Sequence, residues 1–387
     1  MSSYPPRRCG VASFTHDLAA ATGDREIVAL HPPGSAAPYP LEVHHRIRRD
    51  EPADYIQTAQ ALDRCVDVVS IQFSSGIWGG DDGAFVTEFT RGLRLPAVAT
   101  LHTVPEHPTM GQRQTIGLLI DSVAATIVMS PAAARLLTSV YGADRKLLEV
   151  VAHGVPDLPL VDPEKMKPGL GVEGRDVLVS FGLLGPGKGY ELAIDALPQV
   201  VAAHPTALYA IVGSTHPDLV RDDGETYRDG LVARVRRLGM QDHVQFEDRF
   251  VGRVERTRWL QAADIVLTPY TNLDQTISST LACAMGAGRM VVSTPFAYAR
   301  DLLADGRGIL IEPDSPGALG AAVIEALDDP AHRAAVGRRA HEYSRDMVWS
   351  AVGAEYLRVL RAAAGGGATQ VTRVTPARGG RQAAFGA

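Results

Sequence analysis

Short runs of apolar, mostly β-branched residues recur along the chain, and stretches with helical spacing of apolar positions separate most of them. Nearly continuous apolar runs that alternate with helices are typical of parallel sheets covered on both faces. The pattern therefore predicts an α/β protein built from doubly wound, Rossmann-like domains. The predicted strands are residues 27–30, 66–73, 97–101, 125–129 and 147–151, followed by 177–181, 207–212, 243–246, 265–268, 290–293 and 308–311.

A proline-rich stretch over residues 156–168 separates the two series of strands and indicates a domain boundary. The length of 387 residues also exceeds the ~150 residues of a typical single domain. We expect one domain over residues 1–157 and a second over residues 158–348, with a cleft between them. The first domain opens with the loop SSYPPRRCGVASF where a strand is usual, so we expect its first strand to be truncated.

The end of the chain differs in composition from the rest. Residues 364–387 carry Arg373, Arg378 and Arg381, no acidic residue and little that could pack into a core. We therefore expect a disordered basic tail over these residues.

The charge of the chain gives no overall reason to expect a nucleic-acid partner. It carries 38 Lys and Arg against 44 Asp and Glu, a formal net charge of −6. Cys9, Cys65 and Cys283 form no CxxC pair, and no His or carboxylate spacing is typical of a metal site, so we expect neither disulfides nor a metal or other cofactor. No apolar run reaches the ~18 residues of a membrane span, and no signal peptide is evident. We expect a cytoplasmic protein without an integral membrane segment.

The stretch SFGLLGPGKGYELAIDAL contains the strongest local signal for anion binding. It reads as a strand, a loop with Gly182, Gly185, Gly187 and Gly189, and then an amphipathic helix. Glycines let the backbone approach an anion, and a helix N-terminus directs free N–H groups at it. Lys188 adds a mobile positive charge, but Gly189 stands where a P-loop needs Ser or Thr for Mg²⁺, so we reject a P-loop NTPase. A plain turn with a solvated lysine is the alternative.

A second candidate anion site lies in the stretch ADIVLTPYTNLDQTISSTLACAMGAGRMVVSTP. A strand ends there, a polar loop follows, and a helix of small residues begins around Ile277. Backbone amides near Ser278 and Ser279 would face an anion, with Asp274 and Gln275 just ahead of them. Capping of the helix by the same hydroxyl groups explains the sequence equally well, and both roles stay open.

The first domain contributes two further candidates. Gly10 and Val11 precede a predicted helix, and Arg7 and Arg8 just before them could donate hydrogen bonds to a ligand at this turn. His102 follows the carboxyl end of a predicted strand, which is where open α/β sheets place their sites. A single histidine is more often structural, so position alone leaves its role open.

Taken together, these motifs resemble glycosyltransferase family 4, the retaining sugar-nucleotide transferases with the two-domain GT-B fold. The resemblance covers roughly residues 4–363. It implies an interdomain cleft, with the acceptor on the first domain and a UDP-, GDP- or ADP-hexose on the second. It also implies that a final helix over residues 349–363 crosses back to the first domain, and that a hexose moves to the hydroxyl group of a carbohydrate or other acceptor. The motifs are PPRRCG, LHTVP, SPAAARLL, HGVP, GLLGPGKG, AADIVLTPY and GAGRMVV.

The resemblance also implies roles for individual residues. The catalytic groups would be His102 at the donor sugar, Lys188 at the diphosphate, and Asp274 and Gln275 near the transferred sugar. Phe250 would lie near the nucleobase. The implied donor-binding residues are Gly10, Val11, Gly182, Lys188, Phe250, Gln275, Thr276, Ile277, Ser278 and Ser279.

This chain departs from the family pattern at two places. Family members usually carry Gly-Arg-Leu where this chain has Gly182, Leu183 and Leu184, so an arginine beside Lys188 is missing. We expect Arg7 or Arg8 to supply that charge from across the cleft. The two glutamates of the family align here with Gln275 and Cys283, and a thiol is a poor hydrogen-bond partner for a ribose.

The sequence leaves two alternative functions open and disfavours a third. A glycoside phosphorylase of the same fold would use orthophosphate near Lys188 and would not need a ribose contact. A catalytically weakened sugar- or nucleotide-binding protein would explain the lost charged groups. A nicotinamide-dependent dehydrogenase is disfavoured, because no GxGxxG with an acidic residue ~20 positions later follows an early strand.

Overall fold

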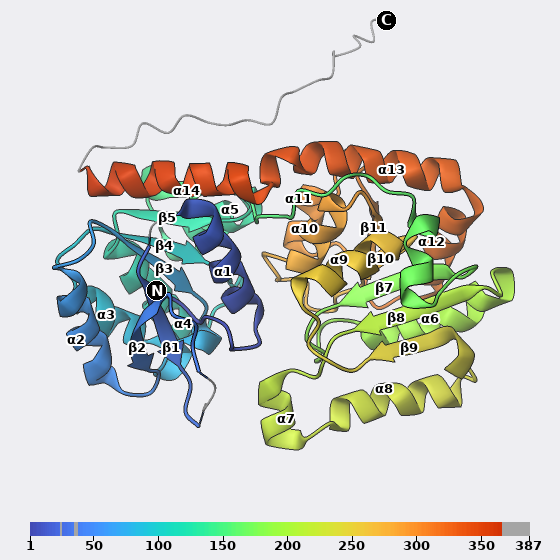
Figure 1. The fold of residues 1–387 in the computed structure, drawn as a ribbon, viewed down its shortest axis with the longest axis horizontal. Helices are drawn as coiled ribbons and strands as arrows, with labels where there is room; N and C mark the ends of the chain where they lie inside the picture. Colours follow the sequence, from blue (N-terminus) through green and yellow to red (C-terminus); the bar gives the residue numbers. More distant parts are fainter. Residues whose placement is uncertain (24, 35–37, 366–387) are drawn as a thin grey trace, which may run out of the picture.

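The computed structural model describes residues 1–23, 25–34 and 38–365, and it contains two α/β units that lie side by side (Figure 1). All strand pairs are parallel, which confirms the predicted fold class. The basic tail predicted over residues 364–387 lies outside the described residues from residue 366 onward. Within the described residues, no helix is long and apolar enough to cross a membrane.

The second unit is built on a six-stranded sheet in the order β12-β11-β10-β7-β8-β9. Its predicted strands are confirmed to within about two residues at their ends. Helices cover both faces of the sheet (Figure 1), so its apolar strands are buried on both sides. The elements are β7 (Asp176–Phe181), α6 (Tyr190–Ala203), β8 (Ala207–Val212), α7 (Pro217–Asp223), α8 (Thr226–Arg237), β9 (Val244–Glu247), α9 (Arg253–Ala262), β10 (Ile265–Thr268), α10 (Ser279–Gly286), β11 (Met290–Ser293), α11 (Ala297–Leu302), β12 (Ile309–Leu310), α12 (Pro316–Asp328) and α13 (Pro330–Tyr343).

The first unit holds a four-stranded sheet in the order β3-β4-β5-β6 and a separate pair of strands, β1 and β2. Its elements are α1 (Gly10–Thr22), β1 (Ile27–His31), β2 (Val43–Arg48), α2 (Pro52–Leu62), β3 (Val69–Phe73), α3 (Phe85–Gly92), β4 (Ala97–Leu101), α4 (Met110–Asp121), β5 (Ala125–Val128), α5 (Pro131–Tyr141) and β6 (Leu148–Val150).

The first residues of the chain connect the two sheets of this unit. Ser2 forms a parallel bridge to Ala29 of β1, and its carbonyl oxygen accepts the N–H of Leu30 at 2.8 Å. On the other side, the N–H of Gln72 in β3 donates to the carbonyl oxygen of Met1 at 3.0 Å. A very short segment therefore occupies the position of a strand between β1 and β3, and the sheet continues through it.

Strand β2 is absent from the sequence prediction. Its sequence, VHHRIR, has only Val43 and Ile47 as buried apolar positions, and polar side chains fill the rest. The strand lies at the edge of the sheet and pairs with β1 alone, so one face and one edge stay in water. A half-buried edge strand of this kind lacks the continuous apolar run that reveals central strands.

The last described helix, α14 (Trp349–Ala364), packs against α1 of the first unit (Figure 1). The ring of Phe14 on α1 lies 5.2 Å from the ring of Trp349 and 6.3 Å from that of Tyr356, centre to centre. An ion pair of 3.0 Å joins Arg358 of α14 to Glu149 of β6. Helix α14 thus ties the first unit to the second through an aromatic cluster.

We predict that Phe14→Ala lowers the free energy of unfolding by about 3 kcal/mol, because Phe14 is 2% exposed and its removal leaves a cavity. Urea denaturation followed by fluorescence measures this change. Leu41→Ala is the control, since Leu41 is 97% exposed and should change the stability by less than about 0.5 kcal/mol. An equal effect of the two substitutions would contradict the role given to the aromatic cluster.

Candidate active site

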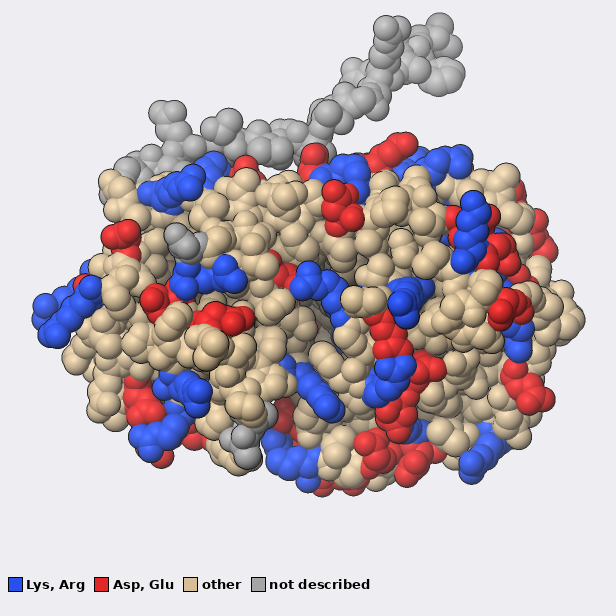
Figure 2. All heavy atoms as spheres, in the orientation of Figure 1, with Lys and Arg blue, Asp and Glu red and all other residues tan. Residues whose placement is uncertain are grey.

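A cleft with a cavity volume of about 1270 Å³ lies between the two units and is lined by both. The loops at the carboxyl ends of β7, β8 and β10 form its wall in the second unit, which is where open parallel sheets place their sites. Figure 2 shows Lys and Arg side chains around the hollow between the units. The cleft is therefore the candidate binding site for an anionic ligand.

The glycine-rich loop is held tightly against the end of β10. Gly189 has φ +70, and a Cβ atom there would lie only 1.8 Å from the carbonyl oxygen of Pro269, so only glycine fits. The N–H of Thr271 donates to the carbonyl oxygen of Gly187 at 3.2 Å. This close approach sets the backbone on both sides of Lys188.

Lys188 is directed at the loop between β10 and α10. Its Nζ donates to Oε1 of Gln275 at 3.2 Å and lies 4.3 Å from the ring centre of Tyr270. The amide of Gln275 in turn donates to the carbonyl oxygen of Ile277 at 2.7 Å. The two predicted catalytic residues Lys188 and Gln275 thus lie together at the cleft, and the ammonium group faces an aromatic ring.

Helix α10 begins at the same wall of the cleft. The Ser278 hydroxyl oxygen accepts the N–H of Leu281 at 3.2 Å and lies 3.0 Å from the Tyr270 hydroxyl group. The hydroxyl group is therefore used for capping, as one reading of the sequence proposed. Ile277, Ser278 and Ser279 nevertheless line the cleft, so the positive end of the helix faces it.

Two residues of the loop between β10 and α10 that were predicted at the site, Thr276 and Asp274, do not line the cleft. The Thr276 hydroxyl oxygen accepts the N–H of Val104 at 3.2 Å, and its carbonyl oxygen accepts from the Ser130 hydroxyl group at 3.4 Å. The buried Thr276 therefore joins the two units and does not line the cleft. Asp274, also outside the lining, forms a turn in which its N–H donates to Oδ1 of Asn272.

His102 is a buried, uncharged imidazole at the cleft. Burial lowers its pKa to about 3, and the nearby His153 adds to this effect. Its Nε2 lies 2.9 Å from Oε1 of Gln72, whose amide nitrogen donates to the hydroxyl oxygens of Ser70 and Thr100. The Gln72 oxygen therefore accepts from Nε2–H of His102, which leaves Nδ1 as an acceptor.

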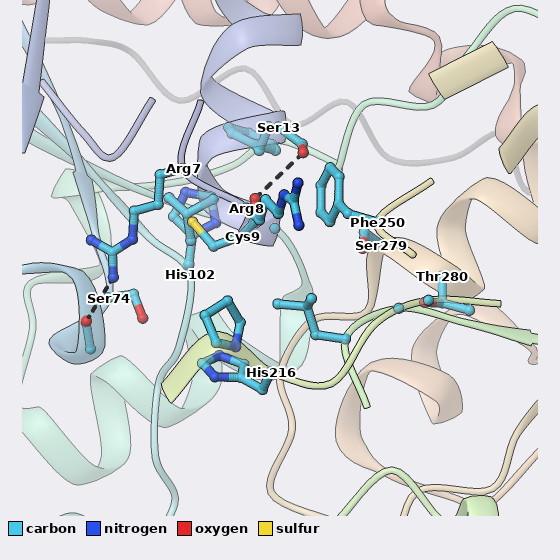
Figure 3. A pocket seen from close by; sticks show the side chains of 18 of the residues that line it. Arg7, Arg8, Cys9, Ser13, Ser74, His102, His216, Phe250, Ser279 and Thr280 are labelled. Carbon is cyan, nitrogen blue, oxygen red and sulfur yellow. Dashed lines mark hydrogen bonds between the residues drawn. The ribbon is translucent and has the colours of Figure 1, made fainter. Parts of the chain in front are cut away.

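The loop before α1 lines the cleft from the first unit. Nη2 of Arg7 donates to the carbonyl oxygen of Gly76 at 3.4 Å, while Arg8 is exposed. Figure 3 shows the two side chains leaving the loop in different directions. Gly10 and Val11 also line the cleft, as do Gly182 and the partly exposed Phe250 of the second unit.

Several lining residues were not predicted. Burial lowers the pKa of His153 to about 4, and burial raises the pKa of the Cys283 thiol. Arg256 on α9 lies with its guanidinium carbon 5.9 Å from the ring centre of Phe181. The sequence holds only a weak signal for Arg256, namely that it shares a helix face with the apolar Trp259 three positions later, which packing in the structure buries. Among the described residues, no group of three or more His, Cys, Asp or Glu could hold a metal ion.

Comparison with known proteins relates the second unit, and more distantly most of the chain, to glycosyltransferases. The sequence model of "Glycosyl transferases group 1" matches residues 162–343. A phosphatidyl-myo-inositol mannosyltransferase of Mycolicibacterium smegmatis is 29% identical over 70% of this chain and 66% of its own length. A GDP-mannose-dependent monoacylated alpha-(1-6)-phosphatidylinositol monomannoside mannosyltransferase of Corynebacterium glutamicum is 24% identical, over 93% of this chain and 96% of its own. The chain thus spans about two thirds of the length of the first relative.

Solved structures agree on the fold. HepE of Anabaena, crystallised with UDP, has a TM-score of 0.67 at 22% identity and covers 80% of this chain and 82% of its own. Sucrose-phosphate synthase of Thermosynechococcus elongatus has a TM-score of 0.73 at 16% identity, over 90% of this chain and 91% of its own. Two parallel-sheet units around a cleft, with these relatives, define the GT-B architecture. The chain therefore has the GT-B fold, and its residues 162–343 match the group 1 glycosyltransferases.

Proposed function

We propose that this chain transfers a hexosyl group from a nucleotide sugar to a hydroxyl group of an acceptor, with retention of configuration at the anomeric carbon. The observation that carries the proposal is the wall of the second unit, where Lys188 and the N-terminus of α10 face the cleft together. We assign the donor to this wall and the acceptor to the first unit, across the cleft. Gly10, His102 and Arg8 would then meet the donor from the acceptor side.

The proposed reaction places the growing negative charge where the positive groups lie. The bond between the anomeric carbon and the diphosphate oxygen breaks, and a bond from the acceptor oxygen to the same carbon forms on the same face. The acceptor proton passes to the departing diphosphate, so no pair of carboxylates is needed. Lys188 and the amides of α10 would stabilise the leaving group. The uncharged His102 would accept a hydrogen bond from a sugar hydroxyl group at Nδ1.

The relatives narrow the choice of substrates for a first test. A relative acts with GDP-mannose, as its name states, and HepE was crystallised with UDP and with UDP-glucose. Other relatives are named D-inositol 3-phosphate glycosyltransferase. We therefore propose a UDP- or GDP-hexose as the donor and an inositol-containing or carbohydrate acceptor.

The first prediction is that purified protein releases UDP or GDP in the presence of a matched donor and acceptor, and that Lys188→Ala lowers this turnover at least ~100-fold. Mass spectrometry follows the nucleotide and the glycosylated product over a panel of UDP-, GDP- and ADP-sugars. The acceptor panel contains inositol, inositol phosphate, phosphatidylinositol and simple sugars. Lys165→Ala is the control, since Lys165 is exposed and outside the cleft.

Other outcomes select other functions. Formation of sugar 1-phosphate that depends on added phosphate would replace the transferase with a phosphorylase. Binding of nucleotide without turnover would indicate a binding protein. Full activity of Lys188→Ala would overturn the site assignment.

A second prediction concerns the charge from the first unit. Arg7→Ala and Arg8→Ala should each raise the KM for the donor about three- to tenfold, because each removes a positive charge that faces the cleft. The effect should shrink at high ionic strength. Arg64→Ala is the control, since Arg64 is exposed and outside the cleft. Unchanged donor KM and turnover in both variants would contradict the role of these arginines.

A third prediction tests the uncharged state of the two buried histidines. Their pKa values of about 3 and about 4 lie below the ordinary value of 6.5, so the unfolded chain binds more protons than the folded one between these limits. The free energy of unfolding should therefore fall as the pH drops below about 6.5. The loss should be about 2 kcal/mol for each histidine between pH 7 and pH 5.

Urea denaturation at a series of pH values measures this loss. His153→Gln should flatten the dependence on pH, whereas His332→Gln, at an exposed position, should leave it unchanged. A stability that is constant from pH 7 to pH 5 would contradict the lowered pKa values, because it would mean that the folded and unfolded chains bind protons equally.

A further inference from the structure

The cleft concentrates positive charge although the whole chain is negative. Its lining contains more basic than acidic side chains, in a protein whose formal net charge is −6. Such a concentration is typical of a site for an anion. The basic residues are Arg7, Arg8, Arg49, Lys188, Arg221 and Arg256, and the acidic ones are Asp17 and Asp218.

Most of these charges already have partners in the protein. Arg49 pairs with Asp50 at 2.8 Å, and Arg221 pairs with Asp218 at 2.7 Å. Asp17 pairs across the cleft with Arg253 of α9 at 3.3 Å.

Arg8 and Arg256 are different. In the part of the chain that the structure describes, neither guanidinium makes a hydrogen bond or an ion pair, and of the two only Arg256 is half-buried.

The position of Arg256 is fixed by the packing of α9. It lies in the first turn of the helix and is half-buried, with its guanidinium near the ring of Phe181 at the carboxyl end of β7. The hydroxyl group of Thr280, in the first turn of α10, donates to the carbonyl oxygen of Phe181 at 2.9 Å. Arg256 therefore stands at the junction of β7 and α10, on the same wall as Lys188.

The charge of Arg256 reaches the interior of the cleft. It opposes protonation of His153, whose pKa burial already lowers, and it favours the thiolate of Cys283, whose pKa burial raises. Both of these residues line the cleft from different units. The guanidinium thus acts on the space between the units and not only on outer solvent.

We propose that Arg256 binds a phosphate oxygen of the leaving nucleoside diphosphate and shares its charge with Lys188. The inference rests on the proposed function and adds a residue to it. A guanidinium presents a planar set of donors that fits a phosphate, and the aromatic ring beside it restricts its motion before the ligand arrives. Because Arg256 and Lys188 belong to one unit, the relative position of the two charges does not depend on the contact between the units.

Under the proposed function, this assignment also supplies a second positive charge for the diphosphate. The loop after β7 carries only Lys188 and has Leu183 where the resemblance implies an arginine, so the second charge would come from another element. Arg7 and Arg8 would have to reach from the first unit, whereas Arg256 stands next to Phe181, two positions before Leu183 in the chain. Only the second unit then forms hydrogen bonds to the diphosphate, while Arg7 and Arg8 of the first unit add longer-range positive charge.

Calorimetric titration with UDP, GDP, uridine and guanosine tests the proposal on the full chain. Arg256→Gln should weaken binding of the preferred nucleoside diphosphate at least ~10-fold and change binding of the matching nucleoside less than about twofold. Arg256→Lys should recover part of the affinity, because it restores the charge but not the planar donors. Arg258→Gln, an exposed arginine of the same helix, should bind like the wild type.

The titrations distinguish a phosphate-binding role of Arg256 from a structural role and from failure of the proposed function. Wild-type affinity of Arg256→Gln for the diphosphate would overturn the proposal. An equal loss of nucleoside and diphosphate binding would also overturn it, since it would mean a structural role for Arg256. Absence of nucleotide binding and of turnover in the wild type would instead overturn the proposed function itself.

Discussion

The site depends on how closely the backbone segments approach one another at the carboxyl edge of the second sheet. A Cβ atom at Gly213 would lie 1.9 Å from the carbonyl oxygen of Gly182, and one at Gly189 would lie 1.8 Å from that of Pro269. Glycine alone lets the ends of β7, β8 and β10 come together in this way. The same approach holds Lys188 over Tyr270 and against Gln275. The position of the charge that defines the cleft is therefore set by the backbone.

The electrostatics of the cleft follow from its two walls. The second unit supplies Lys188, Arg256 and a helix N-terminus, all fixed to one sheet. The first unit supplies buried, uncharged imidazoles and more loosely held arginines. Aromatic packing of Phe14 against α14 and the hydrogen bond from Val104 to Thr276 bring these walls together. One wall is thus suited to a phosphate charge, and the other to hydroxyl groups.

The sequence predicts the parts of this structure that local patterns encode. Central strands appear as continuous apolar runs, and the glycine spacing around Lys188 indicates an anion site before any fold is known. Strand β2 is not predicted from the sequence, because its exposed positions are polar and it has no continuous apolar run. Arg256 is not predicted, because its position at the cleft depends on how α9 packs on β7. Thr276 is predicted at the cleft but lies outside it, because the loop before α10 turns its side chain toward Val104. Tertiary packing, which one sequence does not display, decides these positions.

The central claim is that all direct hydrogen bonds to the phosphate groups of the donor come from the second unit, and a crystal structure of the chain with UDP or GDP tests it most directly. We predict that diphosphate oxygens lie within hydrogen-bond distance of Lys188 Nζ, of the Arg256 guanidinium and of the first-turn amides of α10. A diphosphate bound instead to Arg7 or Arg49 of the first unit, with Lys188 still on Gln275 and Arg256 free, would contradict the claim.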